Sequence, residues 1–441
     1  MPVLPPPRPV SRHPFTEQSK LVPNTRLIAQ GTKKATSTED AQSTGPWFRR
    51  LVLGRLAKID RGLLRLRDQH GVATFGQCCD SYVGEITVRN DRFYRRVALG
   101  GSLGAGEAFL DGDWDSRELT AALRVLARNA ETLRQVERGV PRLIRPLRAA
   151  AHQLRGNSLR GSRRNIARHY NLSNEFFELM LDSTMTYSSG YFPNAGATLE
   201  EASIEKYDRI CRLLRLGPGD HVLEIGTGWG GFALHAVRKY GCRLTTTTIS
   251  KAQHEYAAER FHTSGLKGRI ELLFADYRNL RGQYDKLVSI EMIEAVGERY
   301  LPTYFERCSR LLKPEGVMLL QAITNPDYRY DEYRRRVDFI QKHVFPGGFL
   351  PCPAVITDAL RRKTDLRVAY VEDFADHYAL TIAAWRKKLW GNLDKVRSLG
   401  FDERFLRLWN YYLAYCEAGF LEQRIGVSQW LLSKPQWRPA R

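Results

Sequence analysis

The sequence predicts an α/β protein built on a doubly wound, mostly parallel sheet, with a smaller α+β domain in front of it. Two observations predict this fold class. Beyond residue 165, short apolar runs alternate with segments of helical spacing, which is the element order of a doubly wound sheet. One of those runs, 222–225, passes directly into a glycine loop and then into a helical segment at 231–240. A chain of 441 residues is long enough for two or three packed cores.

The first 164 residues divide into three parts by composition. Residues 1–45 are rich in Pro, Ser, Thr and Arg and are expected to be a disordered basic tail. Residues 46–135 are expected to form the small domain, and residues 136–164 an arginine-rich linker or amphipathic helix. Within the small domain, the pattern predicts a helix over 47–66, strands over 84–89 and 93–99, and a glycine-rich structural turn over 101–114.

Residues 165–441 are expected to form the larger domain. Residues 313–316 (KPEG) are expected to form a turn before its fifth strand. An apolar insertion at 325–370 then breaks the alternation, and it is expected to lie above the sheet edge and build a substrate pocket. Helices are expected over 231–240, 251–262 and 300–312, and strands over 222–225, 243–250, 269–275, 286–290 and 317–323.

The charge of the chain indicates an anionic partner. The formal net charge is +20, and eight arginines but no acidic residue lie between Arg138 and Arg164. Such a block suits nucleic acid or a phospholipid surface, and a solvated helix face is the alternative. The seven cysteines include no C-x-x-C pair, which favours reduced thiols in a cytoplasm over a disulfide framework or a metal site. No apolar run approaches the ~20 residues of a spanning helix.

The glycine loop is the most specific motif. Gly226, Gly228 and Gly231 fit the spacing of a dinucleotide site, but such a site needs a carboxylate about twenty residues further on. No acidic residue lies between Glu224 and Glu255. Glu224 itself stands two residues before the first glycine, which is the placement found in the Rossmann-like fold of S-adenosylmethionine (SAM) dependent methyltransferases. The loop therefore predicts SAM as the cofactor.

Four further motifs carry a family resemblance. Residues 169–177 (HYNLSNEFF), 186–192 (TYSSGYF), 224–230 (EIGTGWG) and 345–348 (FPGG) together resemble the cyclopropane-fatty-acyl-phospholipid synthase family, which includes the mycolic acid cyclopropane synthases. The resemblance runs from about residue 75 to the end of the chain. Through 101–104 (GSLG) and 112–114 (GDW), the small domain resembles the lipid-associated domain of the bacterial phospholipid enzymes.

The resemblance implies a reaction. The SAM methyl group is transferred to the cis double bond of an unsaturated phospholipid acyl chain, and the resulting carbocation loses a proton to a bound bicarbonate, which closes a cyclopropane ring. The alternative product is a methyl-branched or methylene-bearing chain. Ring faces can stabilise the cation. The aromatic candidates are Tyr187, Tyr191, Phe192, Tyr277 and Tyr378.

The resemblance also implies the groups that hold the bicarbonate. Glu294, in 291–297 (EMIEAVG), and Tyr378, in 376–381 (DHYALT), match the family, and Ile323 stands at the position of its backbone amide. Ser189 stands where the family has Cys, and Gln321 where it has His; Ala295 stands where His is frequent. Serine and glutamine can still donate hydrogen bonds to a small anion. The substitutions put the product in question rather than the methyl transfer.

The cofactor contacts follow from the same motifs. The strand-end residues Thr248, Ile249 and Gln253 are expected near the ribose and adenine, and Asp276 near the adenine amino group. Tyr277 fits a cofactor contact and a core aromatic equally well. His169 is expected to fix the segment that closes over the cofactor. The remaining expected cofactor residues are Tyr187, Ser188, Glu224, Gly226, Gly228, Trp229 and Gly230.

Two other classes of function would each account for part of the sequence. A nucleic-acid methyltransferase would account for the basic charge, but residues 291–296 after the fourth strand contain neither a nucleophilic Cys nor an Asn/Asp-Pro-Pro-Tyr/Phe loop. A lipid-binding protein without catalysis is disfavoured because the SAM loop and Glu294 are intact. The expected partners are unsaturated phospholipid acyl chains and an anionic membrane surface, without nucleic acid, and with a homodimer as the alternative to a monomer. The expected location is the cytoplasm, peripherally at the inner face of the membrane.

Overall fold

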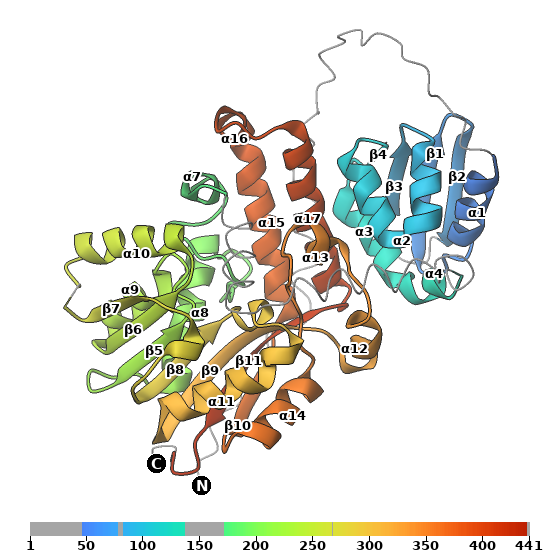
Figure 1. Cartoon of the computed structure of the whole chain (residues 1–441). Coiled ribbons are helices and arrows are strands. Elements are labelled where there is room, and N and C mark those ends of the chain that lie inside the picture. The colour runs from blue at the N-terminus through green and yellow to red at the C-terminus, as the bar shows by residue number, and fades with distance from the viewer. Residues whose placement is uncertain (1–45, 78–82, 137–171, 267, 439–441) are drawn as a thin grey trace. The chain divides into compact units, whose positions relative to one another are not determined.

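A computed structural model of the chain describes residues 46–77, 83–136, 172–266 and 268–438. The chain separates into two compact units, with the division after Arg142, and each unit is described by itself (Figure 1). The expected tail at 1–45 and the arginine block between Arg138 and Arg164 lie outside the described residues.

The N-terminal unit is a four-stranded sheet covered by helices, with strand order β2-β1-β3-β4. Strand β1 pairs antiparallel with β2 and parallel with β3. Helix α3 packs closely on β3, because a Cβ added at Gly84 would lie 2.7 Å from the Cα of Ala122. The elements are α1 (Pro46–Leu56), β1 (Gly62–Asp68), β2 (Gly71–Gln77), β3 (Val83–Val88), α2 (Arg92–Leu110), β4 (Trp114–Asp115), α3 (Leu119–Arg128) and α4 (Ala130–Val136).

The helix predicted over 47–66 was wrong in its second half. Helix α1 ends at Leu56, and β1 begins at Gly62. Gly62 has a φ of 86°, which an α-helix cannot contain. Side chains of β1 alternate between buried and more exposed positions, and pairing with β2 and β3 satisfies the backbone. The strand predicted over 84–89 is confirmed as β3.

The strand predicted over 93–99 and the turn predicted over 101–114 were also wrong, because both fall largely in helix α2. Phe93, Tyr94 and Ala98 are buried, which fits a helical face as well as an alternating strand. The helix has one kink, at Gly101, with φ 58° and ψ −137°. A Cβ at Gly104 would lie 2.1 Å from the carbonyl oxygen of Arg96. These glycines therefore let two helical halves approach each other.

The larger unit is a seven-stranded sheet of order β10-β11-β9-β8-β5-β6-β7. The ladder is parallel from β9 to β7, whereas β11 is antiparallel to both β9 and β10. The strands are β5 (His221–Ile225), β6 (Arg243–Thr248), β7 (Ile270–Phe274), β8 (Tyr284–Ile290), β9 (Leu312–Thr324), β10 (Arg367–Asp373) and β11 (Gly426–Ser433). The helices are α7 (Asn174–Glu178), α8 (Leu199–Leu214), α9 (Gly231–Tyr240), α10 (Lys251–Thr263), η3 (Tyr277–Asn279), η4 (Ile293–Ala295), η5 (Glu298–Tyr300), α11 (Leu301–Leu311), α12 (Asp327–Tyr333), α13 (Phe339–His343), α14 (Pro353–Lys363), α15 (Ala375–Gly391), α16 (Leu393–Ser398) and α17 (Glu403–Leu421).

The predicted elements from 222 to 323 are confirmed to within a few residues, except that β9 begins at Leu312. Tyr284 pairs with Leu312 and Lys286 pairs with Val317, so residues 313–316 bulge out of the ladder. The predicted turn is therefore an outward bulge near the start of the strand.

Helices cover both faces of the larger sheet (Figure 1). Helices α11 and α14 pack on one face through Tyr304, Phe305 and Ile356, and helices α8, α9 and α10 pack on the other. The insertion at 325–370 supplies α12, α13, α14 and part of β10, so half of it extends the core instead of lying above the edge. Its Phe349 N–H donates to the carbonyl of Glu294 at 2.9 Å, which holds the insertion against the end of β8.

The parallel strands β5 to β9 end at one edge of the sheet, here called the carboxyl edge. Helices α15 and α17 pack side by side (Figure 1), and Tyr378 of α15 reaches this edge through its hydrogen bond to Glu291. Within the described ranges, no helix is both long and apolar enough to span a membrane.

Candidate active site at the carboxyl edge

The glycine loop joins β5 to α9 at the carboxyl edge. The amides of Gly226 and Thr227 donate to the Thr247 carbonyl at 3.0 and 3.1 Å, which fixes the loop to the end of β6. Gly228 has a φ of 54°, and a Cβ added there would meet no atom within 4 Å. At Gly230 an added Cβ would lie 2.7 Å from the Phe261 ring. Gly228 therefore leaves open space beside a helix N-terminus, which fits the close approach of SAM, whereas Gly230 permits core packing.

Glu224 supports the loop from below. Its side chain is 2% exposed and accepts a hydrogen bond from the Thr246 hydroxyl at 2.6 Å. Thr246 also contacts the Thr227 hydroxyl at 2.7 Å, so the carboxylate is linked to the loop through two threonines. Burial raises the pKa of Glu224 to about 8, opposed by the hydrogen bond and by the charge of Lys206.

Lys206 is a buried cation that sequence reasoning missed. The side chain is fully buried on α8, and its Nζ donates to the Ser188 hydroxyl at 2.7 Å. Burial lowers its pKa to about 8, against the opposing charges of Glu291, Asp182 and Glu224. A sequence signal was available, because Lys206 stands four residues from the buried positions Ala202 and Ile210.

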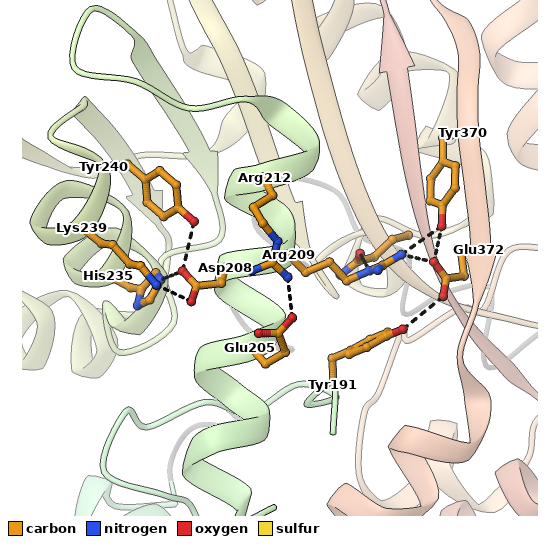
Figure 2. A network of polar contacts seen from close by, with 11 residues as sticks. Tyr191, Glu205, Asp208, Arg209, Arg212, His235, Lys239, Tyr240, Tyr370 and Glu372 are labelled. Carbon is orange, nitrogen blue, oxygen red and sulfur yellow. Dashed lines mark hydrogen bonds and ion pairs between the residues drawn. The ribbon is translucent and has the colours of Figure 1, made fainter. Parts of the chain in front are cut away.

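Neighbouring residues of α8 tie the helix to both sides of the larger unit (Figure 2). Asp208 accepts from His235 at 2.7 Å and from Lys239 at 2.6 Å, both on α9. Arg209 reaches the other way, to an ion pair with Glu372 on β10 and a 3.0 Å hydrogen bond to the Tyr370 hydroxyl. The helix that carries Lys206 is thus held from both sides.

Tyr187 belongs to a group of aromatic side chains that reaches the glycine loop at Trp229. The Tyr187 hydroxyl is 2.9 Å from that of Tyr412, and its ring centroid is 5.2 Å from those of Phe177 and Trp385. Trp229 turns its indole N–H to Asn174 on α7, at 2.8 Å. The Phe177 ring centroid is also 4.8 Å from that of Trp229, so these contacts link Tyr187 to the glycine loop.

Residues after β6 and β7 form local hydrogen bonds at the carboxyl edge. The Thr248 hydroxyl donates to Gln253 Oε1 at 3.0 Å. Ile249, the residue after Thr248, is half-buried. Asp276 caps η3 and binds the Arg278 guanidinium through both oxygens, each at 2.8 Å. Tyr277 is 9% exposed and packs edge-on against Tyr304 in the core. This packing fits the core-aromatic alternative for Tyr277, and its contact with the cofactor stays a prediction.

The groups expected around a bicarbonate are brought together, but around a different carboxylate. Glu291 Oε1 accepts from the Ser189 amide at 2.9 Å and from Gln321 Nε2 at 2.8 Å. Glu291 Oε2 accepts from the Tyr378 hydroxyl at 2.6 Å. Sequence reasoning assigned no role to Glu291, although its place directly after β8 was a usable signal.

Glu294 lies one turn further on and binds the remaining expected group, the backbone amide of Ile323. Its Oε1 accepts from the Ile323 amide at 2.6 Å, and its Oε2 is buried without a hydrogen-bond partner among the described residues. Burial and then the charge of Glu291 raise the pKa of Glu294 to about 8. Glu294 and Ile323 thus pair with each other, whereas Ser189, Gln321 and Tyr378 surround Glu291.

The fold and the glycine loop define a SAM-dependent methyltransferase. Residues 157–430 match the family described as mycolic acid cyclopropane synthetase, and the chain belongs to this family. The tuberculostearic acid methyltransferase UfaA1 of Mycobacterium tuberculosis is 40% identical, over 78% of this chain and 82% of that protein. The cyclopropane-fatty-acyl-phospholipid synthase of Escherichia coli K12 is 33% identical, over 84% of this chain and 92% of that protein.

A solved structure agrees with this assignment. The mycolic acid cyclopropane synthase CmaA1, complexed with SAH and CTAB, is 32% identical and has a TM-score of 0.58. The region that matches covers 62% of this chain and 98% of the CmaA1 chain. The chain is therefore an enzyme of lipid methylation that uses SAM.

Proposed function

We propose that the chain transfers the SAM methyl group to the cis double bond of an unsaturated phospholipid acyl chain and that loss of a proton then closes a cyclopropane ring. The observation that carries the proposal is the position of the carboxylates next to the cofactor loop. Met292 stands between Glu291 and Glu294 in the segment that follows β8, and a Cβ added at Gly226 would lie 3.2 Å from Met292 Cγ. Cofactor and proton acceptor can then reach the same substrate atoms.

Bound SAM supplies a methyl group electrophilic enough to be attacked by an alkene. The chain's own residues have to hold the double bond in line and protect the resulting cation from water. Aromatic rings meet this need at the carboxyl edge. Tyr378 stacks on Phe420 with centroids 4.4 Å apart, and Tyr191 stacks on His377 at the same distance.

The bicarbonate implied by the family resemblance does not fit these residues. Of its expected donors, Gln321 Nε2 and Tyr378 OH already bind Glu291, and the Ile323 amide binds Glu294. The Ser189 hydroxyl donates to the Gly190 carbonyl at 2.9 Å. A further anion would compete for these donors beside two carboxyl groups. No step is assigned to bicarbonate here.

A second product is favoured by one finding. A relative with 40% identity is named a tuberculostearic acid methyltransferase, and one from Pseudomonas putida with 34% identity a probable fatty acid methyltransferase. The same methyl transfer would give a methylene-bearing chain if the proton left so as to form a carbon–carbon double bond. A separate reductase, supplying a hydride and a proton, would have to convert that double bond into a methyl branch. The two products share every step up to the deprotonation.

The positive charge of the arginine block suggests where in the cell the enzyme acts. The eight arginines between Arg138 and Arg164 would bring the enzyme to the anionic inner face of the membrane from the cytoplasm. A surface enzyme would meet phospholipid acyl chains there. This part of the proposal rests on sequence, because the block lies outside the described residues.

The test is the lipid composition of cells that express the chain. Mass spectrometry should show one added CH₂ for each modified double bond, and proton NMR should show ring protons for a cyclopropane or olefinic protons for a methylene group. A Gly228→Val variant is the control without cofactor binding. Unchanged lipids together with methylated nucleic acid would overturn the proposal in favour of a nucleic-acid methyltransferase.

A further inference from the structure

The Glu291 carboxylate lies where an external anion was expected. Three donors converge on it from separate elements: the Ser189 amide at 2.9 Å, Gln321 Nε2 at 2.8 Å and the Tyr378 hydroxyl at 2.6 Å. The Glu291 amide in turn donates to the Gln321 carbonyl at 2.8 Å, which fixes the backbone as well. The carboxylate is therefore an integral part of the site.

The hydrogen bonds leave Glu291 one position to accept a proton. A carboxylate has about four acceptor positions, two on each oxygen. On Oε1 both are taken, by Ser189 and Gln321, whereas Oε2 accepts only from Tyr378 among the described residues. The remaining acceptor position on Oε2 has no partner among the described residues, and it is the position that can take a proton from a substrate at the carboxyl edge.

The backbone at Glu291 is strained. Its φ is 48°, in the left-handed region that glycine occupies without cost and that other residues rarely adopt. Strained residues persist where the surrounding structure holds them and are concentrated at functional sites. Here the hydrogen bonds of Glu291 hold the strained backbone, and the result is a carboxylate directly at the end of β8.

A chain of side chains fixes the donor that faces Glu291. Arginine can only donate, so the 3.0 Å contact of Arg209 Nε requires Gln429 to present its oxygen to Arg209. Gln429 then donates to Gln321 Oε1 at 3.0 Å, and Gln321 Nε2 is left to donate to Glu291. Arg209, seen in Figure 2 beside Glu372, thus acts through two amides, and such chains strengthen each member.

The two neighbouring carboxyl groups have different roles. Glu294 receives one backbone donor, and burial together with the charge of Glu291 raises its pKa to about 8. Burial raises the pKa of Glu291 too, but its three donors and the attraction of Lys206 all oppose that shift and favour the ionised form. When two carboxyl groups lie close together, only one of them is readily ionised. The group that receives more hydrogen bonds carries the negative charge.

We propose that Glu291 is the proton acceptor of the reaction and takes the place of a bound bicarbonate, an inference that rests on the proposed methyl transfer. After the methyl group has been added, a C–H bond of that group breaks and its proton forms an O–H bond with Glu291 Oε2. The released electron pair forms the third carbon–carbon bond of the ring and neutralises the cation. The proton then passes to solvent, so that atoms and charge balance.

The experiment measures product formation from vesicles of an unsaturated phosphatidylglycerol, in CO₂-free buffer and in buffer with added bicarbonate. The wild type should have the same rate in both buffers. Glu291→Gln should lose about 10²- to 10⁴-fold in kcat, as for removal of a general base, with SAM affinity unchanged by calorimetry. Retained SAM binding demonstrates that the variant is folded.

A second variant tests the replacement itself. Glu291→Gly relieves the strained φ and frees the three donors, so its activity should be low without bicarbonate and rise to saturation when bicarbonate is added. Arg215→Gly is the matched control, because Arg215 has a φ of 54° at the end of α8. It should remain independent of bicarbonate.

Three results overturn the inference: a wild type slowed by removal of bicarbonate, full activity of Glu291→Gln, or a Glu291→Gly variant that is active without bicarbonate. Absence of any methylated lipid from the wild type, despite SAM binding, would instead overturn the proposed function. The two failures are therefore distinguishable.

Discussion

At the scale of single residues, the site is a small group of ionisable side chains away from water. Burial favours the neutral form of each one, and it lowers the pKa of Lys206 to about 8 and raises those of Glu224 and Glu294 to about 8. Burial raises the pKa of Glu291 as well, but there three hydrogen-bond donors and the charge of Lys206 oppose the shift. Hydrogen bonding, more than position along the chain, therefore decides which carboxyl group bears the negative charge.

The shifted pKa of Glu294 predicts a pH dependence of stability. Between the ordinary value of 4.5 and about 8, the folded chain keeps a proton that the unfolded chain releases. Raising the pH through this window lowers the free energy of unfolding. Glu294→Gln removes this contribution while its amide oxygen can still accept from Ile323. The Tm of the variant should therefore rise relative to that of the wild type between about pH 5 and 8.

Differential scanning fluorimetry at several pH values checks this expectation. Glu255→Gln, at an exposed position of α10, is the control for loss of one negative charge. A variant that becomes less stable than the wild type as the pH rises would contradict the assigned shift.

The grouping of the five expected anion ligands could be predicted, but not their centre. Ser189, Gln321, Ile323 and Tyr378 belong to motifs that meet at the carboxyl edge, and the structure brings them together. Glu291 and Glu294 are only three residues apart, and the turn after β8 decides which faces which donors. That turn depends on the strained backbone at Glu291, and no residue pattern in the sequence predicts a positive φ there.

At the scale of elements, the junction of β5, the glycine loop and α9 was predictable because each part has a local cause. An apolar run forms the buried strand, glycines supply the positive φ values, and α9 starts at Gly231. In α2, by contrast, the same local rules were wrong. Its glycines serve close packing within a kinked helix, a tertiary requirement that cannot be distinguished from a turn by composition.

The loop gives a prediction about cofactor binding. In Gly228→Val, a branched side chain would enter the open space at φ 54°, where SAM is expected, and SAM binding should be lost. Gly400→Val is a matched control, since Gly400 also has a positive φ, of 89°, and open space around an added Cβ. Both variants should lose some stability, but only Gly228→Val should lose the heat of SAM binding in calorimetry. Unchanged affinity in Gly228→Val would contradict the assignment of the loop.

At the scale of the whole molecule, unbalanced positive charge is concentrated in one stretch of the sequence. The eight arginines from Arg138 to Arg164 have no acidic residue among them. The arginines on the helices of the larger unit often face an acidic neighbour, as in the pairs of Arg361 and Arg362 with Asp358. The unbalanced charge is thus located where lipid contact is proposed.

This asymmetry predicts salt-sensitive membrane binding. Each basic residue near an anionic bilayer contributes about 1 kcal/mol, so four Arg→Gln changes in the block should weaken binding on the order of 10²-fold or more. Vesicle sedimentation should show binding that increases with anionic lipid and decreases with ionic strength. Equal binding to neutral vesicles would count against the proposal. The control carries the same loss of charge at four surface arginines of ion pairs, Arg310, Arg361, Arg362 and Arg397.

The position of β11 has a consequence for synthesis on the ribosome. Strand β11 lies between β9 and β10, so β10 is made before the neighbour that joins it to the sheet. The same strand carries Gln429, which orients Gln321 toward Glu291. A nascent chain can therefore form the cofactor loop early, but it acquires an ordered proton acceptor only after residues 426–433 have emerged. An unfinished chain would then be unable to deprotonate the carbocation until the final strand has been translated.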